Sequence, residues 1–147
     1  MKTIVFLILL VVPILQSCRQ NDCELCFTPP KQFVFEVVDQ NGKNVFTNGV
    51  YQPEQITIIN VLNNKAMEYD FVSENDVNLI SVYSIGWKTE IVNLKIDISD
   101  QHIFNFYVDV ERKNGDCCSY CDYNEISVED AEFDFNQQTE VYKIIAH

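Results

Sequence analysis

The chain has 147 residues, enough for one compact domain, and 22 acidic against 10 basic residues give it a formal net charge of −12. This excess of negative charge argues against binding to nucleic acids and against electrostatic docking on anionic lipid, because both need clustered Lys and Arg. Hydrophobic residues make up 47% of the chain and aromatic residues 12%, which excludes an intrinsically disordered protein.

Residues 1–17 have the pattern of an export signal. Lys2 provides a short basic start, and the segment 4–12 is continuously apolar. A bilayer-spanning helix needs about 20 apolar residues, so this segment is too short to be one. We therefore predict that residues 1–17 are a signal peptide. Its removal makes the net charge more negative, −13, because Lys2 is lost with it.

The signal segment ends in Leu15-Gln16-Ser17-Cys18, which resembles the lipobox of bacterial lipoproteins, where a small residue precedes an obligatory cysteine. The resemblance implies cleavage before Cys18, a diacylglycerol on its thiol and an acyl chain such as palmitate on the new amino terminus. Several acyl chains on one residue make a lasting membrane anchor, whereas one chain binds only marginally. The alternative is an ordinary secretory signal with a coincidental cysteine.

The flanking residues of this motif bear on where the protein resides. Gln16 is a residue that lipoproteins of Bacteroidota-type bacteria tolerate at the second lipobox position. Arg19 stands where Asp would signal retention in the inner membrane. The resemblance thus implies a cell-envelope protein anchored in the outer membrane. It leaves open whether the domain faces the periplasm or the cell surface.

Residues 18–30 are predicted to be a lipidated, cysteine-containing tether, because they are mostly polar and end in Pro29-Pro30, which favours extended chain. Residues 31–147 are predicted to form a single domain. Its apolar or alternating segments are 33–38, 56–62, 67–71, 77–85, 92–98, 104–110, 126–128, 131–135 and 139–146.

Turn residues separate these segments, as in Asn41-Gly42, Asn63-Asn64 and Asn114-Gly115. Several segments alternate apolar with polar residues, which indicates strands with one buried and one exposed face. We predict an all-β antiparallel sandwich of about eight to ten short strands, with an immunoglobulin-like or transthyretin-like topology.

Five cysteines remain besides Cys18, and an oxidising envelope favours disulfides among them. The candidates for disulfides are Cys23, Cys26, Cys117, Cys118 and Cys121. A bond from either tether cysteine to the later cluster would fix the tether against the domain. The odd count leaves at least one thiol unpaired.

Zinc is the alternative. Cys23-x-x-Cys26 and Cys118-x-x-Cys121 are two CxxC pairs, the arrangement of a tetrathiolate zinc site. The compartment and the long gap between the pairs argue for disulfides instead. Catalytic redox chemistry is disfavoured, because no helix is expected after either pair.

Other candidate sites are weak. His102 and His147 are the chain's two histidines, and neither belongs to a Ser-His-Asp or Cys-His arrangement, so we predict no catalytic residues and no enzyme. Trp87 follows Gly86 at a turn, where it would either cap the core or stack on a sugar ring. Six acidic residues could hold calcium, although such a run more often keeps an edge strand soluble: Asp122, Glu125, Glu129, Asp130, Glu132 and Asp134.

Taken together, the lipobox, the cysteine-rich tether, the strand before Asn41-Gly42, the Tyr51-x-Pro53 turn and the Cys117-Cys118 pair resemble the small all-β lipoproteins of unknown function of Bacteroidota-type bacteria. The resemblance implies no particular activity. We expect a non-enzymatic envelope module that needs no cofactor beyond its lipid and that binds a protein or glycan partner. The alternative is a metal-binding lipoprotein that uses the cysteine pairs for zinc or the acidic stretch for calcium.

Overall fold

A computed structural model describes residues 28–47, 49, 51–74, 77–115 and 118–147 of the chain. The signal segment, Cys18 and most of the predicted tether lie outside this description. Across the described ranges, the strands are β1 (Phe33–Val38), β2 (Ile56–Asn60), β3 (Lys65–Ala66), β4 (Asp70–Glu74), β5 (Val77–Val82), β6 (Glu90–Ile98), β7 (Gln101–Asn114), β8 (Ser119–Glu129), β9 (Glu132–Asn136) and β10 (Val141–Ile145).

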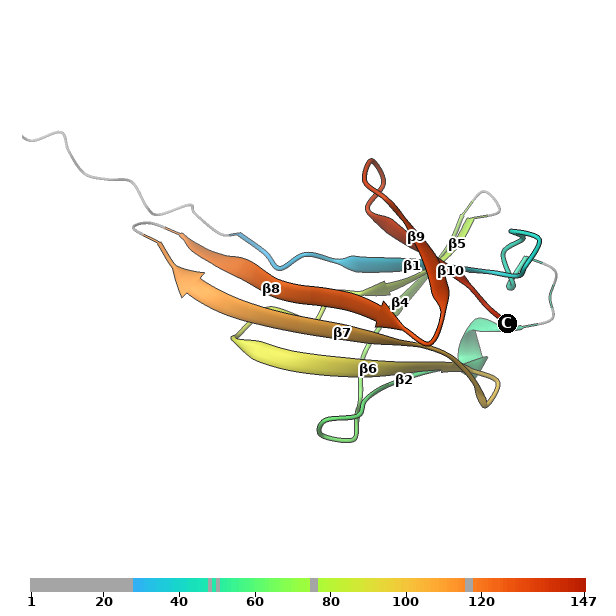
Figure 1. Cartoon of the computed structure of the whole chain (residues 1–147), viewed down its shortest axis with the longest axis horizontal. Coiled ribbons are helices and arrows are strands. Elements are labelled where there is room, and N and C mark those ends of the chain that lie inside the picture. The colour runs from blue at the N-terminus through green and yellow to red at the C-terminus, as the bar shows by residue number, and fades with distance from the viewer. Residues whose placement is uncertain (1–27, 48, 50, 75–76, 116–117) are drawn as a thin grey trace, which may run out of the picture.

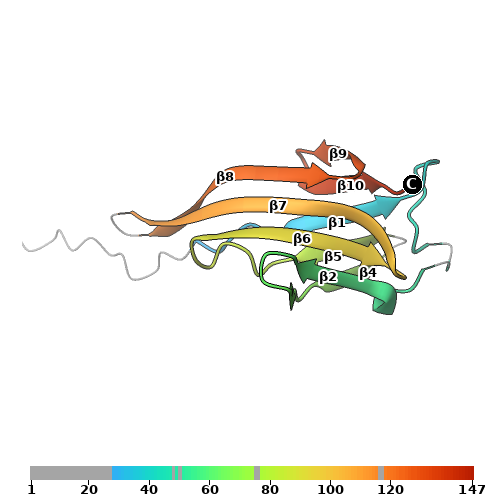
Figure 2. The same ribbon diagram turned by 60° about the horizontal axis from the view of Figure 1, so that its bottom comes forward.

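These strands form two five-stranded sheets stacked on each other, which confirms the predicted β-sandwich (Figures 1 and 2). The strand order is β4-β5-β1-β10-β9 in one sheet and β3-β2-β6-β7-β8 in the other. All neighbouring strands are antiparallel except β1 and β10, which run parallel. The prediction missed this pair, because strands at opposite ends of the domain need no hairpin to join them.

The core lies between the sheets and follows the predicted alternation. From β6 and β7 it takes Val92, Leu94, Ile96, Ile98, Phe104, Phe106, Val108 and Val110, and from β1 and β10 it takes Phe33, Phe35, Val37, Tyr142 and Ile144. The Phe106 ring lies 5.0 Å from that of Phe33 and 4.8 Å from that of Phe35, edge to face in both pairs. Aromatic packing therefore joins the two sheets at the centre of the molecule.

Two predicted strands have different limits in the structure. The segment 56–62 was expected to be one strand, yet β2 ends at Asn60, and Val61 and Leu62 are exposed in a turn. Asn64 closes this turn with a left-handed backbone, φ 55°. Two apolar residues lie here because Asn60 accepts the Leu62 N–H through its side chain and begins the turn.

The segment 67–71 was expected to be one strand, but it carries the chain from one sheet to the other. Strand β3 pairs with β2 and strand β4 pairs with β5 in the opposite sheet. Met67, Tyr69 and Phe71 still pack against the core, so the alternation survives the crossing. Periodicity reports which side chains are buried, and it does not report which backbone pairs with which.

Strand β8 is much longer than the predicted segment 126–128. It pairs with β7 along its whole length, from Asn105↔Glu129 to Asn114↔Ser119, and the Gly115 N–H donates to the Cys118 carbonyl at the tip, 2.8 Å. Figure 1 shows this β7–β8 hairpin extending past the start of β1. The first half of β8 is polar and lies at a sheet edge, so its hydrophobic pattern is faint.

Candidate functional site

The two ends of the sandwich differ in how they are built. The described chain begins at the end where the β7–β8 hairpin protrudes, and the β6–β7 turn and the C-terminus lie at the other end (Figure 1). We call the first the tether end, formed by residues 28–32, 83–90, 110–115 and 118–123. We call the second the pocket end, formed by residues 37–47, 49, 51, 98–103 and 146–147.

Arg112 fastens the incoming chain at the tether end. Its Nη2 donates to the Thr28 carbonyl at 2.9 Å and to the Ser119 Oγ at 2.6 Å, while Nη1 lies 3.1 Å from the Cys121 Sγ. A guanidinium presents its donors in a planar fork, so one side chain can join the first described residues to strand β8. The domain therefore holds the chain from Thr28 onward.

A second set of contacts holds Lys31, three residues after Thr28. Its backbone N–H donates to the Tyr123 hydroxyl at 2.9 Å, and its ammonium lies 3.6 Å from Glu140 and 5.3 Å from the centre of the Phe135 ring. Burial raises the pKa of Tyr123, whose ring packs edge to face on Phe33 at 5.8 Å. This phenol therefore stays neutral and serves as an acceptor for the entering chain.

Of the predicted cysteine sites, Cys118 and Cys121 fall within the described residues, whereas Cys18, Cys23, Cys26 and Cys117 do not. Cys118 is disulfide-bonded, and Cys121 is a free thiol. The Cys121 thiol donates to the Gly86 carbonyl at 3.1 Å. A sulfur in a disulfide cannot act as a thiolate ligand, so this arrangement does not offer Cys118 to zinc. The bond from the tether to the cluster stays a prediction.

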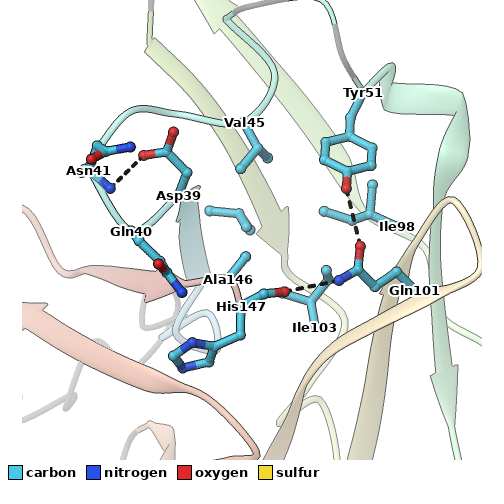
Figure 3. Close-up of a pocket in the computed structure, with 11 residues that line it drawn as sticks. Asp39, Gln40, Asn41, Val45, Tyr51, Ile98, Gln101, Ile103, Ala146 and His147 are labelled. Carbon is cyan, nitrogen blue, oxygen red and sulfur yellow. Dashed lines mark hydrogen bonds between the residues drawn. The ribbon is translucent and has the colours of Figure 1, made fainter.

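The pocket end contains a mainly apolar pocket of about 340 Å³ (Figure 3). Its floor comes from both sheets and from the loop after β1, and it consists of Val37, Val45, Ile98, Ile103 and Ala146. The mouth is lined by Asp39, Gln40, Asn41, Tyr51, Gln101 and His147. A pocket of this size, with an apolar floor and a few polar groups converging on it, is the usual form of a small-ligand site.

A chain of hydrogen bonds spans this mouth. The Tyr51 hydroxyl donates to the Gln101 Oε1 at 3.2 Å, and the Gln101 Nε2 donates to the His147 carbonyl at 3.0 Å (Figure 3). All three residues are at the surface or partly exposed. Exposed neutral hydrogen bonds contribute little net free energy because water can replace either partner. The residues of the mouth are therefore joined by hydrogen bonds that a ligand can replace with its own.

Asp39 is the one acidic residue that lines the pocket. Its Oδ1 accepts the backbone N–H groups of Asn41 and Lys43, both at 2.9 Å, in the turn that Gly42 completes at φ 78°. The hydrogen bond from the Lys43 backbone lowers the pKa of Asp39 most, desolvation opposes it, and the hydrogen bonds from Asn41 lower the pKa further. The carboxylate is thus ionised at neutral pH beside the pocket mouth.

Two other hollows lie on the described surface. One of about 530 Å³ lies at the tether end among Thr28, Lys31, Tyr120 and Tyr123, and one of about 480 Å³ crosses the outer face of the β5-β1-β10-β9 sheet. The first has a more polar lining. In the second, Glu36 and Lys143 pair with each other at 3.6 Å. Neither has an apolar floor drawn from both sheets.

His102 is a structural residue at the side of the sandwich. Its Nδ1 lies 3.0 Å from the Asp97 Oδ1 and its Nε2 lies 3.5 Å from the Asp130 Oδ2. Partial burial would raise the pKa of Asp97, but hydrogen bonds from Lys95 and His102 outweigh it and lower that pKa. These contacts link the bulge in β6 to the β8–β9 turn, where the chain crosses from one sheet to the other. His147, in contrast, lines the pocket.

The acidic stretch follows β8, the turn after it and β9, and both strands lie at sheet edges. Asp122 pairs with Lys113 at 2.6 Å, and Asp130 accepts from Asn105 at 2.6 Å. Over the described ranges, no three His, Cys, Asp or Glu side chains are grouped closely enough to hold a metal ion. The carboxylates are instead spread along edges, where like charges discourage pairing with another chain.

Trp87 does not cap the core, which was the favoured interpretation of its place at a turn. Its side chain is 54% exposed, and its Nε1 donates to the Tyr83 carbonyl at 3.3 Å. Ile85 is fully buried in its place. The preceding Gly86 has φ 95°, a backbone conformation that favours glycine. A Cβ at this position would also lie within 3.3 Å of Pro30 and Cys121.

Sequence reasoning missed the residues that matter most at each end. Tyr51 and Gln101 are 50 positions apart, and no spacing rule links them. Arg112 carried one signal: it stands on the alternation of β7, at the position after Val108 and Val110 where an apolar residue is expected. A cation in an inward register indicates a specific partner.

Over the described ranges, no helix is long and apolar enough to cross a membrane. Comparison of the chain with protein-family models, with curated proteins and with solved structures finds no match.

Proposed function

We propose that this protein is a lipid-anchored, non-enzymatic binding module of the cell envelope, which presents a pocket at the end opposite its anchor. The observation that carries the proposal is the separation of the two ends. The domain holds Thr28 and Lys31 at the tether end, while the pocket lies at the pocket end. An anchor on Cys18, ahead of the held chain, would leave the pocket end facing away from the bilayer.

The lining of the pocket supports binding over catalysis. It contains no Ser, Thr, Cys or Lys that could act as a nucleophile. Four of its six polar side chains are neutral amides or a phenol, which can orient a ligand through hydrogen bonds. The ligand group could belong to a free molecule or to a protein or glycan partner, and the apolar floor favours a group with an aliphatic part.

The anchor is tested in a bacterial host that processes lipoproteins. We expect the wild-type chain to incorporate labelled palmitate and to fractionate with the outer membrane. Cys18→Ala should block acylation and the cleavage that follows it, whereas Cys121→Ala should leave both unchanged. A Cys18→Ala protein that still carries acyl chains would contradict the anchor.

Binding is tested on the acylated protein in lipid nanodiscs with 1-pentanol, a small neutral probe. Methyl NMR resonances of Val45, Ile98 and Ile103 should shift in a saturable way, while those of Ile126 and Val128 stay unchanged. Empty nanodiscs provide the blank for partitioning into lipid. The proposal fails if the pocket methyls do not shift, or if all methyls shift alike.

A further inference from the structure

The charges at the pocket end are one-sided. Asp39 lines the mouth, and no Lys or Arg is among the lining residues. Lys43 adjoins Asp39 through its backbone N–H, and its charge also acts on this carboxylate, but its side chain is not part of the lining. The whole chain adds to this field, with a formal net charge of −12. An anionic ligand would meet repulsion and find no cationic partner here.

The floor adds a second requirement. Val37, Ile98 and Ile103 are nearly inaccessible to water, at 1%, 0% and 6% exposure, and they close the end of the core between the sheets. Because these three side chains expose almost no surface, an aliphatic group in the pocket would release water mainly from the partly exposed Tyr51 and Ala146 beside them. The mouth adds hydrogen-bond donors and acceptors but no Lys or Arg.

We infer that the pocket takes an aliphatic chain with a positively charged head, so that the chain covers the apolar floor and the head lies beside Asp39. This inference rests on the proposed binding function and adds the chemical class of the ligand. Both backbone N–H groups of the turn bind the Asp39 Oδ1, so neither of them uses Oδ2, and the Asn41 side chain also hydrogen-bonds this carboxylate. An alkylamine and a lysine side chain in a peptide share this chemistry.

The experiment compares three probes with the same alkyl chain: n-pentylammonium, 1-pentanol and pentanoate. Each is titrated into the acylated protein in nanodiscs, with the pocket methyls as the readout. We expect n-pentylammonium to bind about three- to fivefold tighter than 1-pentanol, as for an exposed ion pair, and pentanoate to bind weakest. Raising the salt concentration should narrow the difference.

Asp39→Asn is the decisive variant. Asparagine keeps the carbonyl oxygen that accepts from Asn41 and Lys43, so the turn survives and only the charge is lost. The preference for n-pentylammonium over 1-pentanol should disappear, and the affinity for 1-pentanol should stay the same. Asp122→Asn is the matched control, since it removes one negative charge from the tether end and should leave the preference intact.

The outcomes separate the two proposals. If none of the probes shifts the pocket methyls, the binding function itself fails. If 1-pentanol binds and pentanoate binds as tightly as n-pentylammonium, or Asp39→Asn leaves the preference unchanged, the charge inference is overturned. If the preference for n-pentylammonium holds, a titration with Nα-acetyl-lysine methylamide identifies the source of the ligand. Binding of this compound indicates a lysine in a peptide, and its failure to bind, when n-pentylammonium does bind, indicates a free amine.

Discussion

The two ends of this sandwich solve opposite problems with different chemistry. At the tether end, a guanidinium donates to a carbonyl, a hydroxyl and a thiol, and charge-assisted bonds of this kind hold a segment firmly. At the pocket end, neutral side chains bridge the mouth through single hydrogen bonds. The tether end is therefore built to hold its segment in place, whereas the pocket end is built so that a ligand can replace its hydrogen bonds.

The largest expected effect lies in the core that both ends share. Phe106→Ala should lower the free energy of unfolding by about 3–5 kcal/mol, because it removes a fully buried ring packed on Phe33 and Phe35. Tyr107→Ala, on the opposite face of β7, should cost clearly less. Denaturant titration measures both, and equal small losses would contradict the inward and outward assignment of this strand.

At the tether end, Arg112→Ala should cost about 1.5–3 kcal/mol, the range for hydrogen bonds to a charged group. It should also speed proteolysis after Lys31, because the Thr28 carbonyl loses its partner. Lys113→Ala is the matched control, since its ammonium forms exposed pairs with Glu111 and Asp122, and it should lower stability clearly less than Arg112→Ala. If the two variants lose the same stability, Arg112 is not the fastening residue.

At the pocket end, Gln101→Ala should change the free energy of unfolding by less than about 1 kcal/mol, because both of its bonds are exposed. The same change should measurably alter the affinity for 1-pentanol, since Gln101 lines the mouth. A loss of stability as large as that of Arg112→Ala would remove the contrast between the ends.

The smallest effect is on the pH dependence of stability. The folded-state pKa of Asp97 is lowered from 3.8, so its contribution is complete above that value and is lost as the pH falls through the lower folded value. Stability should therefore decrease on acidification below about pH 4. Asp97→Asn should reduce this decrease. An unchanged acid slope in the variant would show that Asp97 does not contribute to it.

Much of the fold could be predicted from the sequence, because burial on one face imposes a period of two. The positions from Val92 to Ile98 and from Phe104 to Val110 are buried as that pattern predicts. Strand pairing could not be predicted, as the parallel β1–β10 pair and the crossing after β3 show. The candidate site was beyond prediction, because Val37, Tyr51 and Gln101 become neighbours only once both sheets are stacked.

The central claim is that the tether end faces the membrane and the pocket end faces away from it. Trp87, the chain's single tryptophan, provides the reporter, because it follows Gly86, which lies against Pro30 at the tether end. In vesicles that contain head-group spin-labelled lipid, the fluorescence of Trp87 in the acylated protein should be quenched. In the double variant Trp87→Phe, Tyr51→Trp, the tryptophan lies at the pocket end and should be quenched far less. Equal quenching at the two positions, or stronger quenching at position 51, would contradict the account.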